Sequence, residues 1–248
     1  METILKATLV SFLSGMATML GAIPVFFLKK KLSHKSYSAM LGISAGIMLG
    51  ATFFSLILQS LEMSDIYTVC SGVILGALFI EFISRIIPHE HFFKGKEGPD
   101  VNIKRIFLFM LAITIHNFPE GMSVGVGWAL DDKIKSISLA TGIGIQNIPE
   151  GSSIALPLLA LGYSKWYCVF ITFLSAIVEP VGGFVGISLV TVFSKLLPFV
   201  LAFAGGCMLY VISGEMIPES HEKGFGKIAT WWLIAGFVIM MFLDNFKF

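Results

Sequence analysis

The chain has 248 residues, of which 56% are hydrophobic and 13% are charged, and its mean hydropathy is +0.86. A soluble domain usually carries about 25% charged residues, so this composition excludes an ordinary soluble protein and favours a lipid environment. The formal net charge of +1 offers no basic surplus for nucleic acid, and three cysteines without CxxC spacing predict neither a disulfide framework nor a zinc knuckle.

Eight apolar segments follow one another, each long enough to cross a bilayer as a helix. The first is too long for a signal peptide, and three lysines follow it where a cleavage site would have small residues, so we expect a retained helix. The rest of the chain suffices only for short loops, the longest at about 88–104, so residues 1–248 are expected to form a single transmembrane domain. The predicted helices lie at about 5–28, 38–61, 66–87, 105–130, 136–161, 166–192, 197–217 and 228–246.

Lysine and arginine are distributed unevenly between the two sides of the predicted bundle. Twelve of the 17 follow the first, third, fifth and seventh segments, and the others lie on the opposite side. By the positive-inside rule both termini are expected on the extracytoplasmic side. Short loops without an organelle signal make a bacterial-type plasma (inner) membrane the default location.

Short sequence matches recur between the first three and the last three segments at an offset of 160 or 161 residues. Five crossings separate the members of each pair, and because five is odd, the two triplets must be inverted relative to one another. The pattern predicts an all-α membrane protein of eight helices in a 3+2+3 arrangement with an inverted repeat, as in many secondary transporters, and a functional site near the midplane. The matches are Ser11–Ser14 with Thr172–Ser175, 41–49 with 201–209, and Gly76 with Gly236.

The two middle segments carry polar motifs that match each other. One reads HNFPEG at 116–121 and the other QNIPEG at 146–151. At about 100° per residue, the first, second and fifth positions of each motif share one helix face. The face of the first motif presents an imidazole, an amide and a carboxylate, and that of the second presents two amides and a carboxylate. Each proline leaves one backbone carbonyl without its helical partner and kinks the helix near these polar groups.

Three carboxylates are predicted within the membrane, on Glu120, Glu150 and Glu179. A carboxylate at the bilayer centre costs about 2.5–3.5 kcal/mol on the insertion scale. Three of them without a lysine or arginine nearby would repel one another or take up protons. A divalent cation would neutralise them, and imidazole, carboxylate and amide oxygen are suitable ligands for it. A single polar residue within the membrane more often forms a hydrogen bond between helices than a metal site, whereas two matched motifs favour a metal site.

The motifs HNFPEG and QNIPEG, on adjacent middle helices of such a chain, resemble those of the ZIP family of zinc and iron transporters. The resemblance implies a binuclear metal site in which Glu120 and Glu150 bridge two ions. The chain departs from many members at Gln146, where a histidine is common, and at Asn147, where some relatives have aspartate. A neutral amide at that position weakens the cage of the second ion. The ligands implied are His116 and Gln146 for one ion, Asn117, Asn147 and Glu179 for the other, and the thioether of Met48.

Several weaker candidates follow the expected ion path. Each candidate also has an explanation without metal binding: the serine could simply pack, the exit residues could form a solvated helix end, and the two histidines could belong to an ordinary polar loop. The candidates are Ser55 for the path, Glu215, Glu219 and His221 for an exit region that resembles that of the family, and His89 and His91 for handing metal onward.

Together these features predict inward transport of a divalent transition-metal ion. The resemblance favours Zn²⁺, with Fe²⁺, Cd²⁺ and Mn²⁺ as alternatives, and the metal is cargo, so no cofactor is expected. The absence of thiolate ligands disfavours Cu⁺, and the histidine disfavours Mg²⁺ and Ca²⁺. The rivals are a static metal-selective channel and an intramembrane metalloenzyme, but the protein is expected not to be an enzyme because the HExxH pattern of zinc proteases is absent. The oligomeric state stays open, with a homodimer as one candidate.

Overall fold

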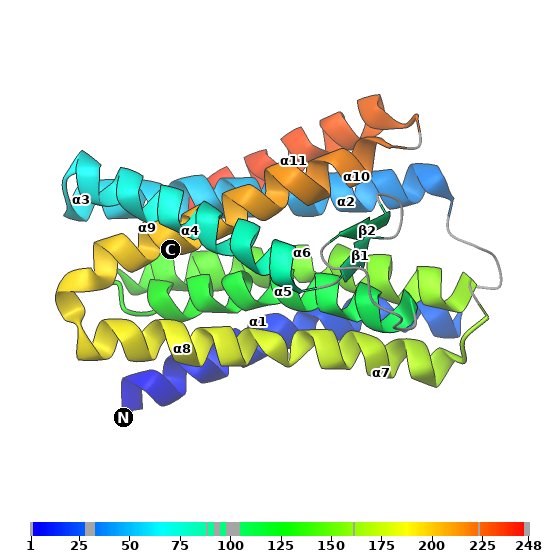
Figure 1. The fold of residues 1–248 in the computed structure, drawn as a ribbon, viewed down its shortest axis with the longest axis horizontal. Coiled ribbons are helices and arrows are strands. Elements are labelled where there is room, and N and C mark those ends of the chain that lie inside the picture. Colours follow the sequence, from blue (N-terminus) through cyan, green and yellow to red (C-terminus); the bar gives the residue numbers. More distant parts are fainter. Residues whose placement is uncertain are drawn as a thin grey trace.

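The structure is a computed structural model that describes residues 2–27, 33–87, 89–91, 95–97, 105–160, 162–222 and 224–245. Side chains are described throughout these ranges except at 89–91, 95–97, 105–114 and 160. Long helices dominate the described chain and lie roughly along one direction (Figure 1). One short antiparallel hairpin, β1 (His89–His91) with β2 (Gly95–Glu97), lies within the polar loop before α5.

The helices of the first half are α1 (Glu2–Ala22), the short 3-10 helix η1 (Ile23–Phe26), α2 (His34–Gly50), the π-helix η2 (Ala51–Ile57), α3 (Leu58–Met63), α4 (Ile66–Ile86) and α5 (Arg105–Gly127). Those of the second half are α6 (Lys133–Ala160), α7 (Lys165–Ala176), α8 (Val178–Val192), η3 (Ser194–Leu196), α9 (Leu197–Val211), the π-helix η4 (Ile212–Met216), α10 (Ile217–His221) and α11 (Gly226–Asn245).

Polar residues in the turns cap several of these helices. The Ser33 and Ser164 hydroxyls accept hydrogen bonds from backbone N–H groups in the first turns of α2 and α7. Asp65 caps α4, and its carboxylate accepts bonds from the Thr68 hydroxyl and from the N–H groups of Thr68 and Tyr67. These bonds, with the Thr68 hydroxyl first, lower the pKa of Asp65 below its ordinary value.

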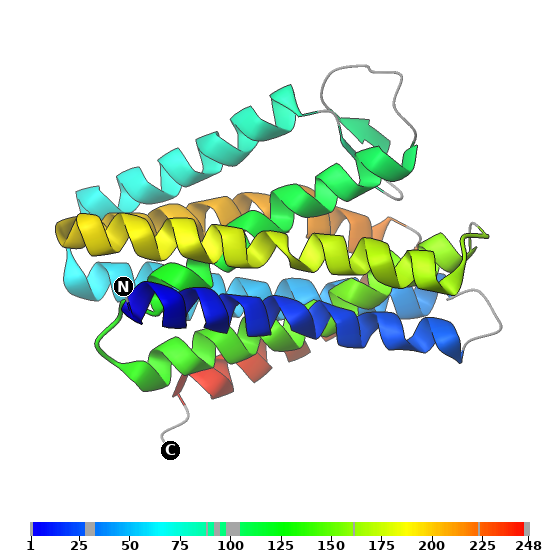
Figure 2. The same ribbon diagram turned by 90° about the horizontal axis from the view of Figure 1, so that it is seen from below.

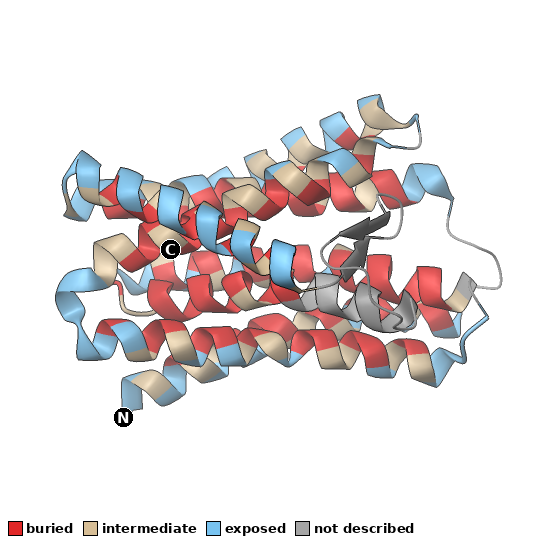
Figure 3. Ribbon diagram, viewed as in Figure 1, coloured by how far each residue is buried: buried red, intermediate tan, exposed pale blue. Residues whose placement is uncertain are grey.

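Six helical stretches of the described chain are long and apolar enough to cross a membrane. Large apolar side chains also cover the outside, such as Trp231, which is 72% exposed on α11, and Phe82, which is 59% exposed on α4. Figure 3 shows that α4 carries much of its exposed surface on the outer side of the bundle. The prediction of a helical, multi-pass membrane protein is therefore confirmed. The six stretches are Glu2–Phe26, His34–Met63, Ile66–Ile86, Lys165–Val192, Ser194–His221 and Gly226–Asn245.

The helices pack as two bundles, which Figures 1 and 2 show from two sides. In the first bundle α1 packs on α6 and α5 packs on α8, with α7 beside α1; in the second, α2 packs on α11 and α4 on α9. The bundles meet where α6 touches α2 and where α5 touches α9. The first turn of α1 and the last turn of α11 lie at the same end of the molecule (Figures 1 and 2).

Matched glycine contacts hold the second bundle together. A Cβ added to Gly76 in α4 would collide with the carbonyl oxygen of Phe203 in α9, and one added to Gly236 in α11 would collide with the carbonyl oxygen of Ile43 in α2. Both members of the second contact are 160 residues from their counterparts in the first. Close backbone approach through small residues is typical of membrane helices. The π-helices η2 and η4, which start 161 residues apart, interrupt α2 and α9 at matching places.

Candidate metal site

The two motif helices carry their polar groups into the interior. α5 and α6 both continue through the motif prolines, Pro119 and Pro149, without ending. The carboxylates of the motifs are buried, with Glu120 at 1% and Glu150 at 7% exposure. Charges at this depth are rare unless they have a function, because lipid and protein interior solvate them poorly.

The glycine that ends each motif is in close backbone contact with another helix. The backbone of Glu179 in α8 lies so close to Gly121 that a Cβ there would collide with the Glu179 carbonyl oxygen. The Ser11 hydroxyl of α1 donates to the same carbonyl at 2.9 Å. Thr18 in α1 lies equally close to Gly151. The first contact places the fully buried Glu179 carboxylate beside the motifs.

A chain of hydrogen bonds joins α5, α6 and α8. The Gln146 amide nitrogen donates to Glu120 Oε2 and to Asn147 Oδ1, each at 2.6 Å. The Asn147 nitrogen in turn donates to Glu179 Oε1 at 2.8 Å and to the Ser14 carbonyl at 3.1 Å. Both amides therefore act here as donors toward carboxylates, which satisfies one oxygen of Glu120 and one of Glu179.

Four buried oxygens of the motifs and of α8 have no hydrogen-bond partner among the described residues. Buried polar atoms nearly always have a partner, so several orphans in one region call for a ligand. All four are oxygens with free lone pairs, which suit a cation. Among the described residues, however, no three His, Cys, Asp or Glu side chains lie close enough to bind one metal ion. The amides of Gln146 and Asn147 lie between the carboxylates of Glu120 and Glu179. The four are Asn117 Oδ1, Glu120 Oε1, Glu150 Oε2 and Glu179 Oε2.

The remaining residues of the predicted ligand set lie nearby but face different partners. His116 is paired through Nε2 with the buried Glu215 carboxylate of η4, which belongs to the other bundle. Asn117 donates through its amide nitrogen to the Ser175 carbonyl of α7 at 3.0 Å. Met48 is 1% exposed in α2 and belongs to the hydrophobic core.

The weaker candidates lie at the two ends of the second bundle. Ser55 in η2 donates to Asp244 in α11 at 2.7 Å, and Asp244 is an acidic residue that the sequence reasoning missed although it lies in an apolar segment. Glu219 in α10 accepts a bond from the Tyr37 hydroxyl at 2.9 Å. The side chains of His89 and His91 lie outside the described part of the chain.

His221 ends α10 with both ring nitrogens engaged. Nδ1 lies 2.8 Å from the Ser220 hydroxyl and 2.9 Å from the Ile217 carbonyl, and Nε2 lies 2.9 Å from the Thr230 hydroxyl of α11. The Nε2 contact ties α10 to α11. Since both nitrogens are engaged, His221 would have to break a contact at one of them before it could bind a metal through that nitrogen.

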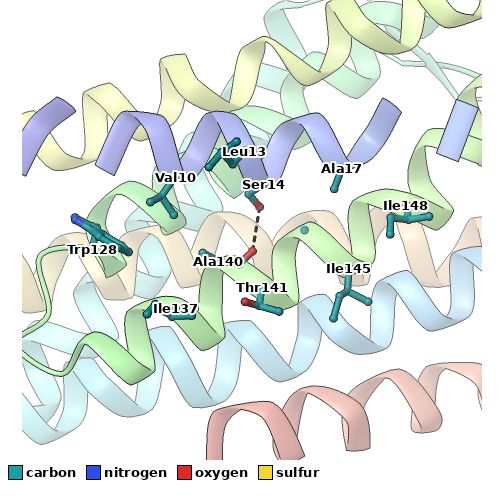
Figure 4. A pocket seen from close by; sticks show the side chains of 11 residues that line it. Val10, Leu13, Ser14, Ala17, Trp128, Ile137, Ala140, Thr141, Ile145 and Ile148 are labelled. Atoms are coloured by element: carbon teal, nitrogen blue, oxygen red, sulfur yellow. Dashed lines mark hydrogen bonds between the residues drawn. The ribbon is translucent and has the colours of Figure 1, made fainter. Parts of the chain in front are cut away.

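A cavity of about 480 Å³ opens between α1 and α6 (Figure 4). Its walls are mostly apolar, with Trp128 at one end and Ile148 toward the other (Figure 4). None of the three buried carboxylates lines it. The Ser14 hydroxyl at its wall donates to the Ala140 carbonyl at 3.2 Å. The described residues that line the cavity include no carboxylate, imidazole or thiol, so the lining offers no strong ligand for a metal ion.

Comparison with known proteins agrees with the motifs. Residues 94–244 match the family described as ZIP zinc transporter. The chain is 44% identical over 244 residues to zinc transporter GufA of Myxococcus xanthus, covering 94% of this chain and 96% of that protein.

This chain belongs to the ZIP family.

Other relatives extend the family across bacteria and animals. Zinc transporter ZIPB of Bordetella bronchiseptica is 39% identical over 246 residues, with 92% of this chain and 77% of that protein covered. Zinc transporter ZIP11 of Homo sapiens is 31% identical over 334 residues, with 98% and 97% covered. The family and these relatives are transporters, which fits the expectation of a ZIP protein that is not an enzyme.

Proposed function

We propose that this ZIP protein carries zinc ions across a membrane into the cytoplasm through a site between α5, α6 and α8. The observation that carries the proposal is the set of buried oxygens on Glu120, Glu150 and Glu179 that have no hydrogen-bond partner among the described residues. Burying an ionised carboxylate without compensation is costly, and a divalent cation offers the charge and the ligand contacts that these oxygens lack.

The donor types around these oxygens suit zinc better than a hard alkaline-earth ion. Imidazole binds zinc well, carboxylates complete such sites, and a thioether adds a soft ligand. We propose that Glu120 and Glu150 bridge two ions, and that the amides lying between the carboxylates turn away or become ligands when metal arrives. The proposed ligands are Met48, His116, Asn117, Glu120, Gln146, Asn147, Glu150 and Glu179.

The proposed path continues from this site toward both membrane surfaces. On the cytoplasmic side the contact of His116 with Glu215 supports an exit along η4 and α10, with Glu219 further on. On the opposite side the Ser55–Asp244 pair offers a buried hydroxyl and a carboxylate near the end of the bundle. His89 and His91 stay proposed acceptors beyond the exit, and we assign His221 to holding the end of α10.

We further propose that residues 1–248 form one domain with eight membrane crossings, in which α5 and α6 lie between two inverted triplets. The matched glycine contacts support this arrangement, because Gly76–Phe203 and Gly236–Ile43 are related by one constant offset. The lysine and arginine distribution supports extracytoplasmic termini in a plasma membrane, and the common end of α1 and α11 agrees with an even number of crossings.

Uptake of zinc into proteoliposomes under an inside-negative potential tests the proposal. A potential of about 100 mV contributes about 4.6 kcal/mol for a divalent ion, so inward movement needs no nucleotide. Wild type, Glu150→Ala and Glu222→Ala are compared; Glu222 is an exposed acidic residue in the turn after α10 and serves as the matched control.

We expect saturable uptake by wild type and Glu222→Ala, and loss of uptake in Glu150→Ala that elutes as a folded protein on size exclusion. Uptake that rises linearly with zinc would favour a metal-lined channel over a carrier. Equal leak through wild type and Glu150→Ala would overturn the proposed path.

A further inference from the structure

We propose that Ser44 is a positioning residue that governs whether the amide oxygen of Gln146 is offered to the transported ion. Ser44 lies in α2 and is fully buried. Its hydroxyl lies 2.8 Å from Gln146 Oε1 and 2.9 Å from the backbone carbonyl oxygen of Gln146. The inference deepens the proposed function, on which it rests, by naming a residue that acts on the ion only through a ligand.

The hydrogen bonds of the Gln146 amide fix which way its oxygen points. Both N–H groups are used, one on Glu120 and one on Asn147, at 2.6 Å each. A flipped amide would bring its oxygen against two other oxygens at that distance, which is repulsive. The amide oxygen therefore faces Ser44, and the Ser44 hydroxyl withholds it from the ion site.

Ser44 has one hydroxyl proton and two acceptors that belong to the same residue. When the proton points to Oε1, the amide oxygen is occupied. When it turns to the backbone carbonyl, the amide oxygen is released while Ser44 keeps a hydrogen bond. The release therefore exchanges one bond for another instead of leaving a buried hydroxyl unsatisfied, and capture of the oxygen by Ser44 favours departure of the ion.

The corresponding position of the other half has no hydroxyl. Residue 204, at an offset of 160 from Ser44, is Ala204, which is buried in α9. The matching motif there has His116 in place of Gln146, and an imidazole has no amide oxygen to hold back. The hydroxyl is thus found on the side where the motif has an amide.

Removing the hydroxyl should free the amide oxygen permanently. Because one hydrogen bond contributes about 0.5–1.5 kcal/mol net, Ser44→Ala should lower the KM for zinc about 2- to 10-fold and also lower the maximal rate, since release of the ion becomes slower. Ser44→Thr keeps a hydroxyl at the same atom and should restore both values. Ser38→Ala removes another buried serine from α2 and should leave both unchanged.

The experiment measures the KM and maximal rate of zinc uptake in proteoliposomes for these variants, each also combined with Gln146→Ala, together with equilibrium zinc binding in detergent. We expect Ser44→Ala to bind zinc more tightly, and to have no further effect once Gln146 is alanine. An unchanged or raised KM, no rescue by Ser44→Thr, or an equal shift in the Gln146→Ala background would overturn the proposal.

Zinc binding in detergent separates this proposal from the proposed function. Should wild type bind zinc without transporting it, the transport function would fail, while tighter binding by Ser44→Ala would still support the role of Ser44. Unchanged binding by Ser44→Ala under those conditions would overturn that role as well.

Discussion

The two motif helices resemble each other in their backbone contacts and differ in their side-chain partners. In α5, Gly121 lies against Glu179 of α8; in α6, Gly151 lies against Thr18 of α1. The positions of Thr18 and Glu179 are 161 residues apart, the same offset that relates the first segments of the two triplets. The glycine contacts therefore repeat, but a hydroxyl stands on one side where a carboxylate stands on the other.

The first residues of the motifs differ in the same way. His116 is paired with the carboxylate of Glu215, whereas Gln146 accepts from Ser44 and donates to Glu120. The repeated contacts depend on backbone and glycine, which build the fold, while the differing contacts depend on side-chain chemistry, which builds the site. The comparison teaches that one packing plan can hold two chemically different halves of the proposed ion site.

The largest effect is expected where the two motifs agree, at their glutamates. Glu120→Gln keeps the size of the side chain and an oxygen, but it removes the charge. Changes around metal ligands often reduce affinity about 10- to 100-fold, so loss of a charged ligand should reduce zinc uptake more than about 100-fold. Initial uptake rates in proteoliposomes check this, with Glu222→Gln as the control; uptake within about threefold of wild type would show that Glu120 is no ligand.

A second prediction concerns the repeated packing. Gly151→Ala should push α1 and α6 apart, because a Cβ at Gly151 collides with the Thr18 carbonyl, and overpacking costs about 1–3 kcal/mol. Gly144→Ala is the matched control in the same helix, since a Cβ at Gly144 would meet its nearest neighbour at 3.7 Å, an ordinary contact.

Thermal unfolding in detergent distinguishes the two alanine variants. We expect a melting temperature several degrees lower for Gly151→Ala and one near wild type for Gly144→Ala. Equal melting temperatures for the two would mean that the close contact of α1 with α6 does not limit stability.

The sequence predicted those features that depend on residue type at fixed spacing. The membrane character and the family are confirmed, because apolar length and a repeated HNFPEG-type pattern are visible in one dimension. The partners of the motif side chains were not predictable, since Ser44 and Glu215 are distant in sequence and only the packing of two bundles brings them near. Residues beyond Gly50 are also hard to assign to a face, because the π-helix η2 has wider turns than an α-helix.

A smaller effect is expected when both motifs begin with glutamine. His116→Gln removes the imidazole and its contact with Glu215, and leaves an amide that binds zinc less well. We expect zinc uptake to fall about 10-fold, equivalent to about 1.4 kcal/mol, while the variant stays folded. Uptake of zinc and of cadmium is measured side by side; an unchanged rate for both would show that the imidazole is not needed on the path.

The smallest effect is expected at Thr18, whose hydroxyl takes the position that the carboxylate of Glu179 has in the other half. Thr18 is fully buried, and its Oγ1 has no hydrogen-bond partner among the described residues. Thr18→Val has nearly the same shape and removes an unsatisfied polar atom, so stability should stay equal or rise slightly, and zinc uptake should change less than about twofold. Uptake and thermal unfolding are compared with those of Glu179→Gln, for which we expect a clear loss of uptake. A large loss in Thr18→Val would instead show that the hydroxyl contacts the ion, and that both halves of the repeat, rather than the Glu179 side alone, contribute an oxygen at this position.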